Sequence, residues 1–137
     1  MKQITLLIVI LLIAACNHNV ENSTDPIAGY WSGEVAMMEG TGQKMQTIEI
    51  GILIIPGCTI GNFCGKYSED DFCPGGIILM EVEGRRYNFL AETTTGSQNA
   101  CGSGDFRTFD LELRSDGRLN FIYRNGDSYS GILDSEN

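Results

Sequence analysis

The sequence predicts an all-β protein, an antiparallel eight-stranded up-and-down barrel that follows an N-terminal signal helix. Three observations predict this fold. Eight short segments alternate apolar and polar residues with the period of two that a half-buried strand requires. Turn signals rich in Gly, Asn, Asp and Pro separate these segments at short intervals, and consecutive strands usually pair. No segment beyond residue 15 has the sustained 3.6-residue period of an amphipathic helix.

Residues 1–15 have the features of a secretion signal peptide. Lys2 precedes an apolar run over residues 4–15, which is shorter than the roughly 20 residues of a membrane-spanning helix. Ile13-Ala14-Ala15-Cys16 resembles the bacterial lipobox, whose cysteine becomes the lipidated N-terminus of the mature protein. We therefore expect a lipid on Cys16 that anchors an exported protein to the membrane, the alternative being an ordinary cleaved signal. Asn17 favours the outer membrane, because an Asp there would favour inner-membrane retention.

Removal of the signal leaves 122 residues with eight basic and 18 acidic side chains, a net charge of −10. We expect no nucleic-acid partner, because phosphate contacts need a basic surface. Residues 16–27 are polar and predict a flexible tether, which leaves residues 28–137 for the barrel domain. His18, the only histidine, lies in the tether, so a Ser or Cys nucleophile has no histidine base. We expect neither an enzyme nor a cofactor.

Four strands are predicted in the first half of the domain, at residues 29–38, 45–56, 63–68 and 76–83. Pro56-Gly57 ends the second strand, and Glu69-Asp70-Asp71 forms an acidic loop after the third. We interpret this loop as solvated, because its carboxylates lack the spacing of a calcium loop. The predicted rows of residues on one face are Trp31, Gly33, Val35 and Met37; Ile48, Ile50, Ile52 and Ile54; and Ile78, Met80 and Val82.

The second half of the domain contains four more predicted strands, at residues 85–92, 106–114, 118–124 and 127–134. Gly84 turns the chain into the first of them, and a polar, glycine-rich loop over residues 93–105 follows it. Ser115-Asp116-Gly117 predicts the next turn, and Asn125-Gly126 is a strong signal for a type I′ hairpin. The predicted inward rows are Tyr87, Phe89 and Ala91; Phe109, Leu111 and Leu113; and Leu119, Phe121 and Tyr123.

Four cysteines remain besides the anchor: Cys58, Cys64, Cys73 and Cys101. An even number of cysteines in a small exported domain predicts disulfides, and four cysteines allow three connectivities. We favour Cys58–Cys64, which would close a small loop, together with Cys73–Cys101, which would link two distant hairpins. A zinc site is the alternative. It is disfavoured because the spacings contain no C-x-x-C pair and no histidine lies near them, so we expect no bound metal.

Two resemblances follow from these motifs. Gly29-Tyr30-Trp31-Ser32-Gly33 is similar to the G-x-W start of lipocalins and to the first strand of avidin-like barrels. Residues 73–79, 87–92, 101, 111–121 and 131–133, in this order, resemble the small exported β-barrel domains of bacterial lipoproteins, which also form the extracytoplasmic ends of some bacterial protein kinases. The second resemblance implies a lipocalin-like fold with cysteines paired across hairpins. The lipocalin resemblance implies that Trp31 lies at a closed barrel end, beneath a basic residue such as Arg124.

Inward aromatic side chains are the candidate ligand-binding residues, and they either fill the barrel or line a cavity. Phe106 and Tyr129 are expected near the barrel mouth. The leading hypothesis is a lipid-anchored extracytoplasmic module that binds a small apolar or amphipathic ligand. The alternatives are a protein-binding module, such as an inhibitor of an envelope hydrolase that uses loops 57–63 and 93–105, and a structural envelope component. The candidate ligand-binding residues are Trp31, Tyr87, Phe89, Phe109, Phe121 and Tyr123.

Overall fold

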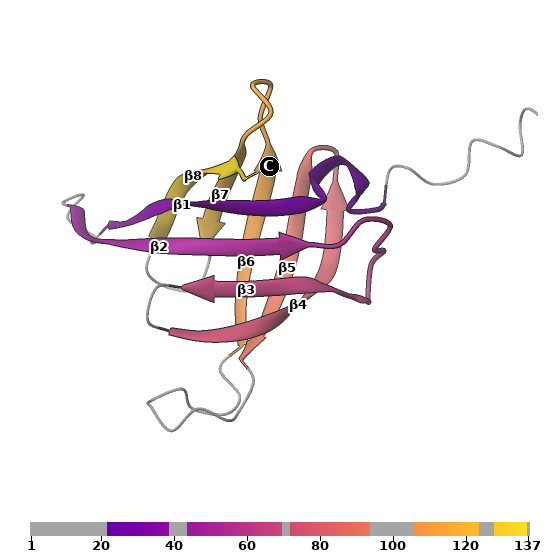
Figure 1. Cartoon of the computed structure of the whole chain (residues 1–137), viewed down its shortest axis with the longest axis horizontal. Coiled ribbons are helices and arrows are strands. Elements are labelled where there is room, and N and C mark those ends of the chain that lie inside the picture. Colours follow the sequence, from indigo (N-terminus) through magenta and orange to yellow (C-terminus); the bar gives the residue numbers. More distant parts are fainter. Residues whose placement is uncertain (1–21, 39–43, 70–71, 94–105, 124–127, 137) are drawn as a thin grey trace, which may run out of the picture.

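Eight antiparallel strands pair in chain order, and the last pairs with the first, so the sheet closes into a barrel (Figure 1). The computed structural model describes residues 22–38, 44–69, 72–93, 106–123 and 128–136. The predicted signal helix and Cys16 lie outside these residues, whereas the predicted barrel is confirmed. The strands are β1 (Gly29–Met38), β2 (Lys44–Ile54), β3 (Phe63–Glu69), β4 (Phe72–Glu83), β5 (Arg86–Thr93), β6 (Phe106–Leu113), β7 (Leu119–Tyr123) and β8 (Ser128–Ser135).

The barrel closes between β1 and β8, where two glycines allow the strands to approach closely. A Cβ atom on Gly33 would lie 2.4 Å from the carbonyl oxygen of Ile132, and one on Gly131 would lie 2.6 Å from that of Glu34. Val35 and Gly131 are register partners across this seam. Each of the eight described strands has a paired neighbour on both sides, so none is a free edge strand, the usual template for aggregation.

One end of the barrel is closed by the residues that precede β1. A short 3₁₀ helix, η1 (Asp25–Ile27), places the fully buried Ile27 beneath the barrel end. Trp31 Nε1 donates a hydrogen bond to the carbonyl oxygen of Ile27 at 2.8 Å. The Thr24 hydroxyl donates to the carbonyl oxygen of Ile55 at 2.6 Å and accepts from the Cys58 amide at 3.1 Å. Packed residues thus begin before residue 28, where the sequence places the start of the barrel domain.

Cys58 and Cys64 form a disulfide, with their Cα atoms 5.5 Å apart, in the connection between β2 and β3. This confirms the first favoured pairing. The second pairing involves Cys101, which lies outside the described residues, as does Arg124. Among the described residues, we find no helix long and apolar enough to cross a membrane.

The predicted inward row of β4 is wrong, and a β-bulge gives the reason. Ile77 and Leu79 are fully buried, whereas Met80 is 46% exposed. The register with β5 shifts between Leu79 and Glu81, so that one residue is left without a partner and the alternation of faces is reset. Val82 consequently packs against the core as expected, although Met80 does not.

Gly65→Ala should destabilise the barrel much more than Gly84→Ala. Both glycines have positive φ, at +144° and +60°. An added Cβ would lie only 1.8 Å from the Leu53 carbonyl oxygen at Gly65 but would meet nothing within 4 Å at Gly84. We expect Gly65→Ala to lower the free energy of unfolding by about 1–3 kcal/mol more than its control, in line with the usual cost of overpacking. Urea unfolding followed by Trp31 fluorescence measures both losses, and equal losses would contradict the close contact.

Candidate functional site

Stacked aromatic rings fill the middle of the barrel. Phe109 packs against Phe89, Phe121 and Tyr67, with ring centroids 5.6, 5.2 and 5.3 Å away. The three phenylalanines are almost completely buried. Offset aromatic pairs at these distances stabilise a core beyond the area they bury. Phe89 and Phe109, which the sequence offers as ligand-binding residues, therefore serve as core.

Two further predicted residues also pack in the core. Trp31 lies at the closed end, as the lipocalin resemblance implies. Its indole N–H donates a hydrogen bond to the carbonyl oxygen of Ile27. Tyr87 lies close to the β4–β5 turn, opposite Val82, and is buried. Neither residue is among those that line the cavity at the open end or the outer groove formed by the described residues.

A cavity of about 230 Å³ opens at the other end of the barrel, above the aromatic stack. It lies at the end where β1, β3, β5 and β7 finish and the intervening strands begin. Phe121 forms part of its floor, and Tyr123, the last strand residue of β7, forms part of its wall. The sequence thus predicts two of its lining residues, and it also places Tyr129 correctly at the mouth. The full lining is Ile48, Ile50, Tyr67, Glu69, Arg107, Phe121, Tyr123 and Tyr129.

The polar part of the cavity is a cluster of Tyr67, Glu69 and Arg107. The Tyr67 hydroxyl donates a hydrogen bond to Glu69 Oε1, and Arg107 Nη1 forms an ion pair with the same oxygen. The Glu69 side chain is 9% exposed, whereas that of Arg107 is 33% exposed. Arg107 therefore presents the accessible part of the cluster to the cavity, and Glu69 lies beneath it.

The structure corrects the interpretation of Glu69 as part of a solvated loop. β3 extends to Glu69, where it pairs with Phe72, the first residue of β4. The alternation of β3 places Tyr67 and Glu69 on the same inward face. The sequence contains the signal for this placement, because residues at positions i and i+2 of a strand point to the same face. The rest of the predicted acidic loop, Asp70 and Asp71, lies outside the described residues.

The Tyr67 phenol and the Arg107 guanidinium both have a raised pKa, so both stay protonated. Burial, reinforced by the charge and hydrogen bond of Glu69, raises the pKa of the Tyr67 phenol far above its ordinary value. Burial alone would lower the pKa of Arg107, but the hydrogen bond and charge of Glu69 outweigh it, and the pKa is raised. The cluster therefore contains a neutral phenol and a guanidinium cation that share one carboxylate oxygen.

Tyr123 and Tyr129 form an aromatic wall of the cavity. Their rings meet edge to face at 87°, with centroids 5.3 Å apart. They come from β7 and β8, which lie side by side as an antiparallel pair. Both rings are half-buried and so remain accessible to a bound molecule.

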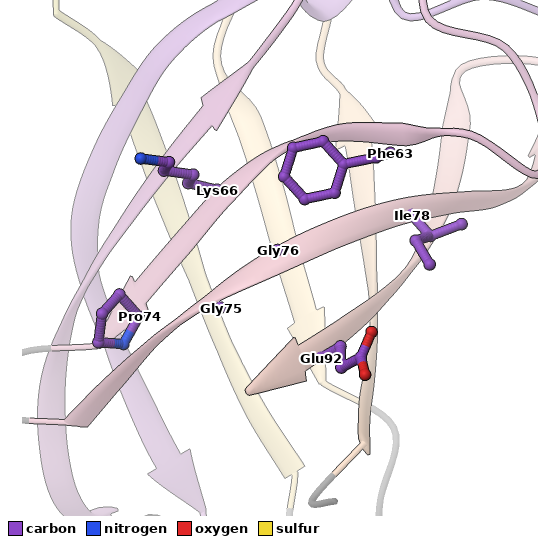
Figure 2. Close-up of a pocket in the computed structure, with 7 residues that line it drawn as sticks. All are labelled: Phe63, Lys66, Pro74, Gly75, Gly76, Ile78 and Glu92. Atoms are coloured by element: carbon purple, nitrogen blue, oxygen red, sulfur yellow. The ribbon is translucent and has the colours of Figure 1, made fainter. Parts of the chain in front are cut away.

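A second hollow, a groove of about 340 Å³, lies on the outer surface of β3, β4 and β5. Figure 2 shows Phe63 and Lys66 on β3, with Glu92 on β5. Gly75 and Gly76 of β4 line the groove, and the missing side chain of Gly76 leaves room for the Phe63 ring. It contains none of the residues that the sequence offers for ligand binding.

No protein family, curated protein or solved structure matches the chain. Within the described ranges, no three His, Cys, Asp or Glu side chains lie close enough together to hold a metal ion. The function must therefore be inferred from the cavity and the surface themselves.

The buried Tyr67 phenol should give the stability of the barrel a characteristic alkaline dependence. In the unfolded chain Tyr67 ionises at its ordinary pKa of 10.0, whereas in the folded protein the pKa is raised. The contribution of the Tyr67 phenol to the free energy of unfolding is therefore complete below pH 10. It is lost as the pH rises above 10, by about 1.4 kcal/mol per pH unit. Urea unfolding between about pH 8 and pH 11 should show a shallower decline in Tyr67→Phe than in the parent protein. Identical declines would contradict a protonated, buried phenol.

Proposed function

We propose that the protein is a lipid-anchored extracytoplasmic module that binds a small amphipathic molecule at the open end of its barrel. The anionic or acceptor-rich head of the ligand contacts Arg107, and its apolar part packs against Tyr123 and Tyr129. The observation that carries this proposal is the composition of the cavity, in which an accessible guanidinium faces a wall of aromatic rings.

The relative exposure of Arg107 and Glu69 favours a ligand with acceptor atoms. Glu69 already accepts hydrogen bonds from Tyr67 and Arg107 and is almost covered. Arg107 uses one guanidinium nitrogen for Glu69, and a guanidinium has five N–H donors in a planar fork. Carboxylate and phosphate groups match that fork, whereas a ligand cation would meet the exposed positive charge first.

The size of the cavity favours a small ligand. Its volume of about 230 Å³ lies below the usual range of roughly 300–1,000 Å³ for drug-sized molecules. The aromatic stack beneath it prevents a longer molecule from extending down the barrel axis. A single aromatic or short aliphatic acid fits these limits better than a long-chain lipid does.

The position of the chain entry supports an anchored arrangement. Residues 22–27 pack at the closed end of the barrel, and the cavity opens at the opposite end. With a lipid on Cys16, the closed end would face the membrane and the cavity would face away from it. The resemblance to exported lipoprotein barrels favours an address in the bacterial cell envelope, and Asn17 favours its outer membrane.

Binding of indole-3-acetate and of its neutral amide tests the proposal directly. Isothermal titration with the purified protein should show tighter binding of the acid, because its carboxylate meets Arg107. A hydrogen bond to a charged group contributes roughly 1.5–3 kcal/mol, so we expect the amide to bind about tenfold to a hundredfold more weakly. Arg107→Lys, which keeps a cation beside Glu69, should lose most of this preference.

Lys66→Met is the matched control, since it removes a cation from the outer groove and should leave the preference for the acid unchanged. Equal affinity for acid and amide, or a preference that survives in Arg107→Lys, would contradict the role of Arg107. Native mass spectrometry of protein isolated from its own cells provides an independent test. A retained small acid supports the proposal, whereas a retained protein supports a protein-binding module instead.

A further inference from the structure

Large apolar side chains are exposed around the closed end of the barrel. Phe63 is 57% exposed and Ile60 is 45% exposed, values that are high for residues of this size. The other members are exposed residues of β2, of the residue that follows it and of β4, together with the half-buried Ile78 of β4. We name the group the closed-end patch; it consists of Leu53, Ile55, Ile60, Phe63, Ile78 and Met80.

Backbone contacts join these residues into one surface. The Ile55 amide donates a hydrogen bond to the Cys64 carbonyl oxygen at 2.9 Å, which places Ile55 beside Phe63. Phe63 and Ile78 are register partners between β3 and β4. The Gly61 amide donates to the Leu79 carbonyl oxygen at 2.8 Å, which places Ile60 beside Met80. A contiguous apolar surface of this kind usually marks an interaction site.

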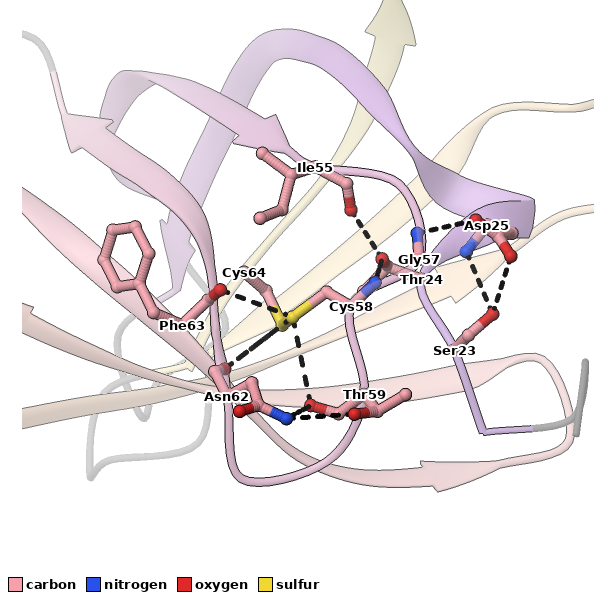
Figure 3. Close-up of a disulfide and its surroundings, with 10 residues drawn as sticks. All are labelled: Ser23, Thr24, Asp25, Ile55, Gly57, Cys58, Thr59, Asn62, Phe63 and Cys64. Carbon is pink, nitrogen blue, oxygen red and sulfur yellow. Dashed lines mark hydrogen bonds between the residues drawn. A yellow bond between two sulfur atoms is a disulfide. The ribbon is translucent and has the colours of Figure 1, made fainter.

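The patch is held rigidly in place. The Cys58–Cys64 disulfide closes the loop that carries Ile60, and hydrogen bonds from Asn62 to Thr59 stiffen its tip (Figure 3). The Phe63 ring lies against Gly76, where an added Cβ would be 2.3 Å from Cε2 of the ring. This ring also forms one wall of the outer groove, which continues the apolar surface toward Pro74 (Figure 2).

The chain enters the barrel at the same place. Ser23 forms an isolated β-bridge with Thr59, and the Thr24 amide donates a hydrogen bond to the Cys58 carbonyl oxygen at 2.9 Å. Five residues lie between Cys16 and Asn22, and the six steps from one to the other span about 20 Å when fully extended. A lipid on Cys16 would therefore hold Asn22, where the chain enters beside the patch, within about 20 Å of the bilayer.

We propose that the closed-end patch docks on the bilayer to which Cys16 is anchored. This inference rests on the proposed lipid anchor. Ile60 and Phe63 insert into the boundary between headgroups and acyl chains, and Lys66, beside the groove, faces the lipid phosphates. The patch consists of apolar side chains, and the groove beside it carries one basic and one acidic side chain, Lys66 and Glu92, so the local charge does not oppose contact with neutral lipid. Tethering makes the contact intramolecular, so a small apolar area is sufficient.

A bilayer is favoured over a protein partner because the anchor already brings the lipid surface to the patch. The hydrogen bonds of Thr24 fix the chain entry beside the disulfide-closed loop, so the tether leaves the barrel next to the patch. In this orientation the ligand cavity at the other barrel end stays open to the solvent. Docking and ligand binding thus use opposite ends of one barrel.

Tryptophan fluorescence of the full lipidated chain tests the docking. Phe63→Trp places a probe in the patch, and Ile132→Trp places a matched probe on an exposed apolar position of β8. Both variants retain Trp31, whose signal in the parent protein is subtracted. In phosphatidylcholine vesicles, we expect a blue shift for Trp at position 63 and loss of its fluorescence when the lipid is replaced by brominated phosphatidylcholine. The probe at position 132 should show neither change.

The outcomes separate docking from anchoring. Equal responses at positions 63 and 132 in protein that floats with the vesicles would overturn the docking and leave the anchor intact. Protein whose Cys16 carries no acyl mass and which does not float would overturn the anchor and the docking together. A blue shift at position 63 that requires a co-purified protein and persists without lipid would overturn the docking in favour of a protein partner. Ile60→Trp provides a second probe within the patch, where the same response as at position 63 is expected.

Discussion

The closed barrel is the constraint on which the rest of the structure depends. Once β1 pairs with β8, every inward side chain must share one enclosed space, and eight strands leave room for little more than those side chains. Phe89, Phe109 and Phe121 occupy the middle of that space together with Tyr67. The cavity therefore exists only where this stack ends, and its position follows from the placement of the aromatic residues along the strands.

The inward carboxylate of Glu69 is the least expected feature of this interior. An ion pair with one buried partner contributes little net stability, because desolvation of the buried charge offsets the attraction. An apolar side chain in place of Glu69 would fill the same space at lower cost. In the proposed function the cluster of Tyr67, Glu69 and Arg107 serves a bound molecule rather than folding, a role that strongly perturbed groups in a cleft often have.

The sequence predicts the barrel well because its main signal, the alternation of faces, is local. Tyr87 and Phe89 share a face whatever their partners are, and the structure places them inside. The β4 row fails at Met80 because a bulge depends on the register with β5, which no single strand encodes. Glu69 was missed for a similar reason: its strand is extended by pairing with Phe72, while the acidic residues that follow it are typical of a turn. Arg107 joins the cluster from β6, whereas Glu69 lies on β3, and no local sequence pattern links residues so far apart in the chain.

The two ends of the barrel differ because, among the described residues, the chain enters at one of them. η1 and Trp31 seal that end, and the hydrogen bonds of Thr24 tie the entry to the disulfide-closed loop, so the apolar side chains there are fixed relative to Thr24. Among the described residues, no side chain on the sealed end lines the cavity, since the aromatic stack lies between them. A molecule could therefore occupy the open end without moving the end that the chain enters. In the proposed function, the packed interior separates anchorage from ligand binding, and the same stack that limits the size of the ligand provides this separation.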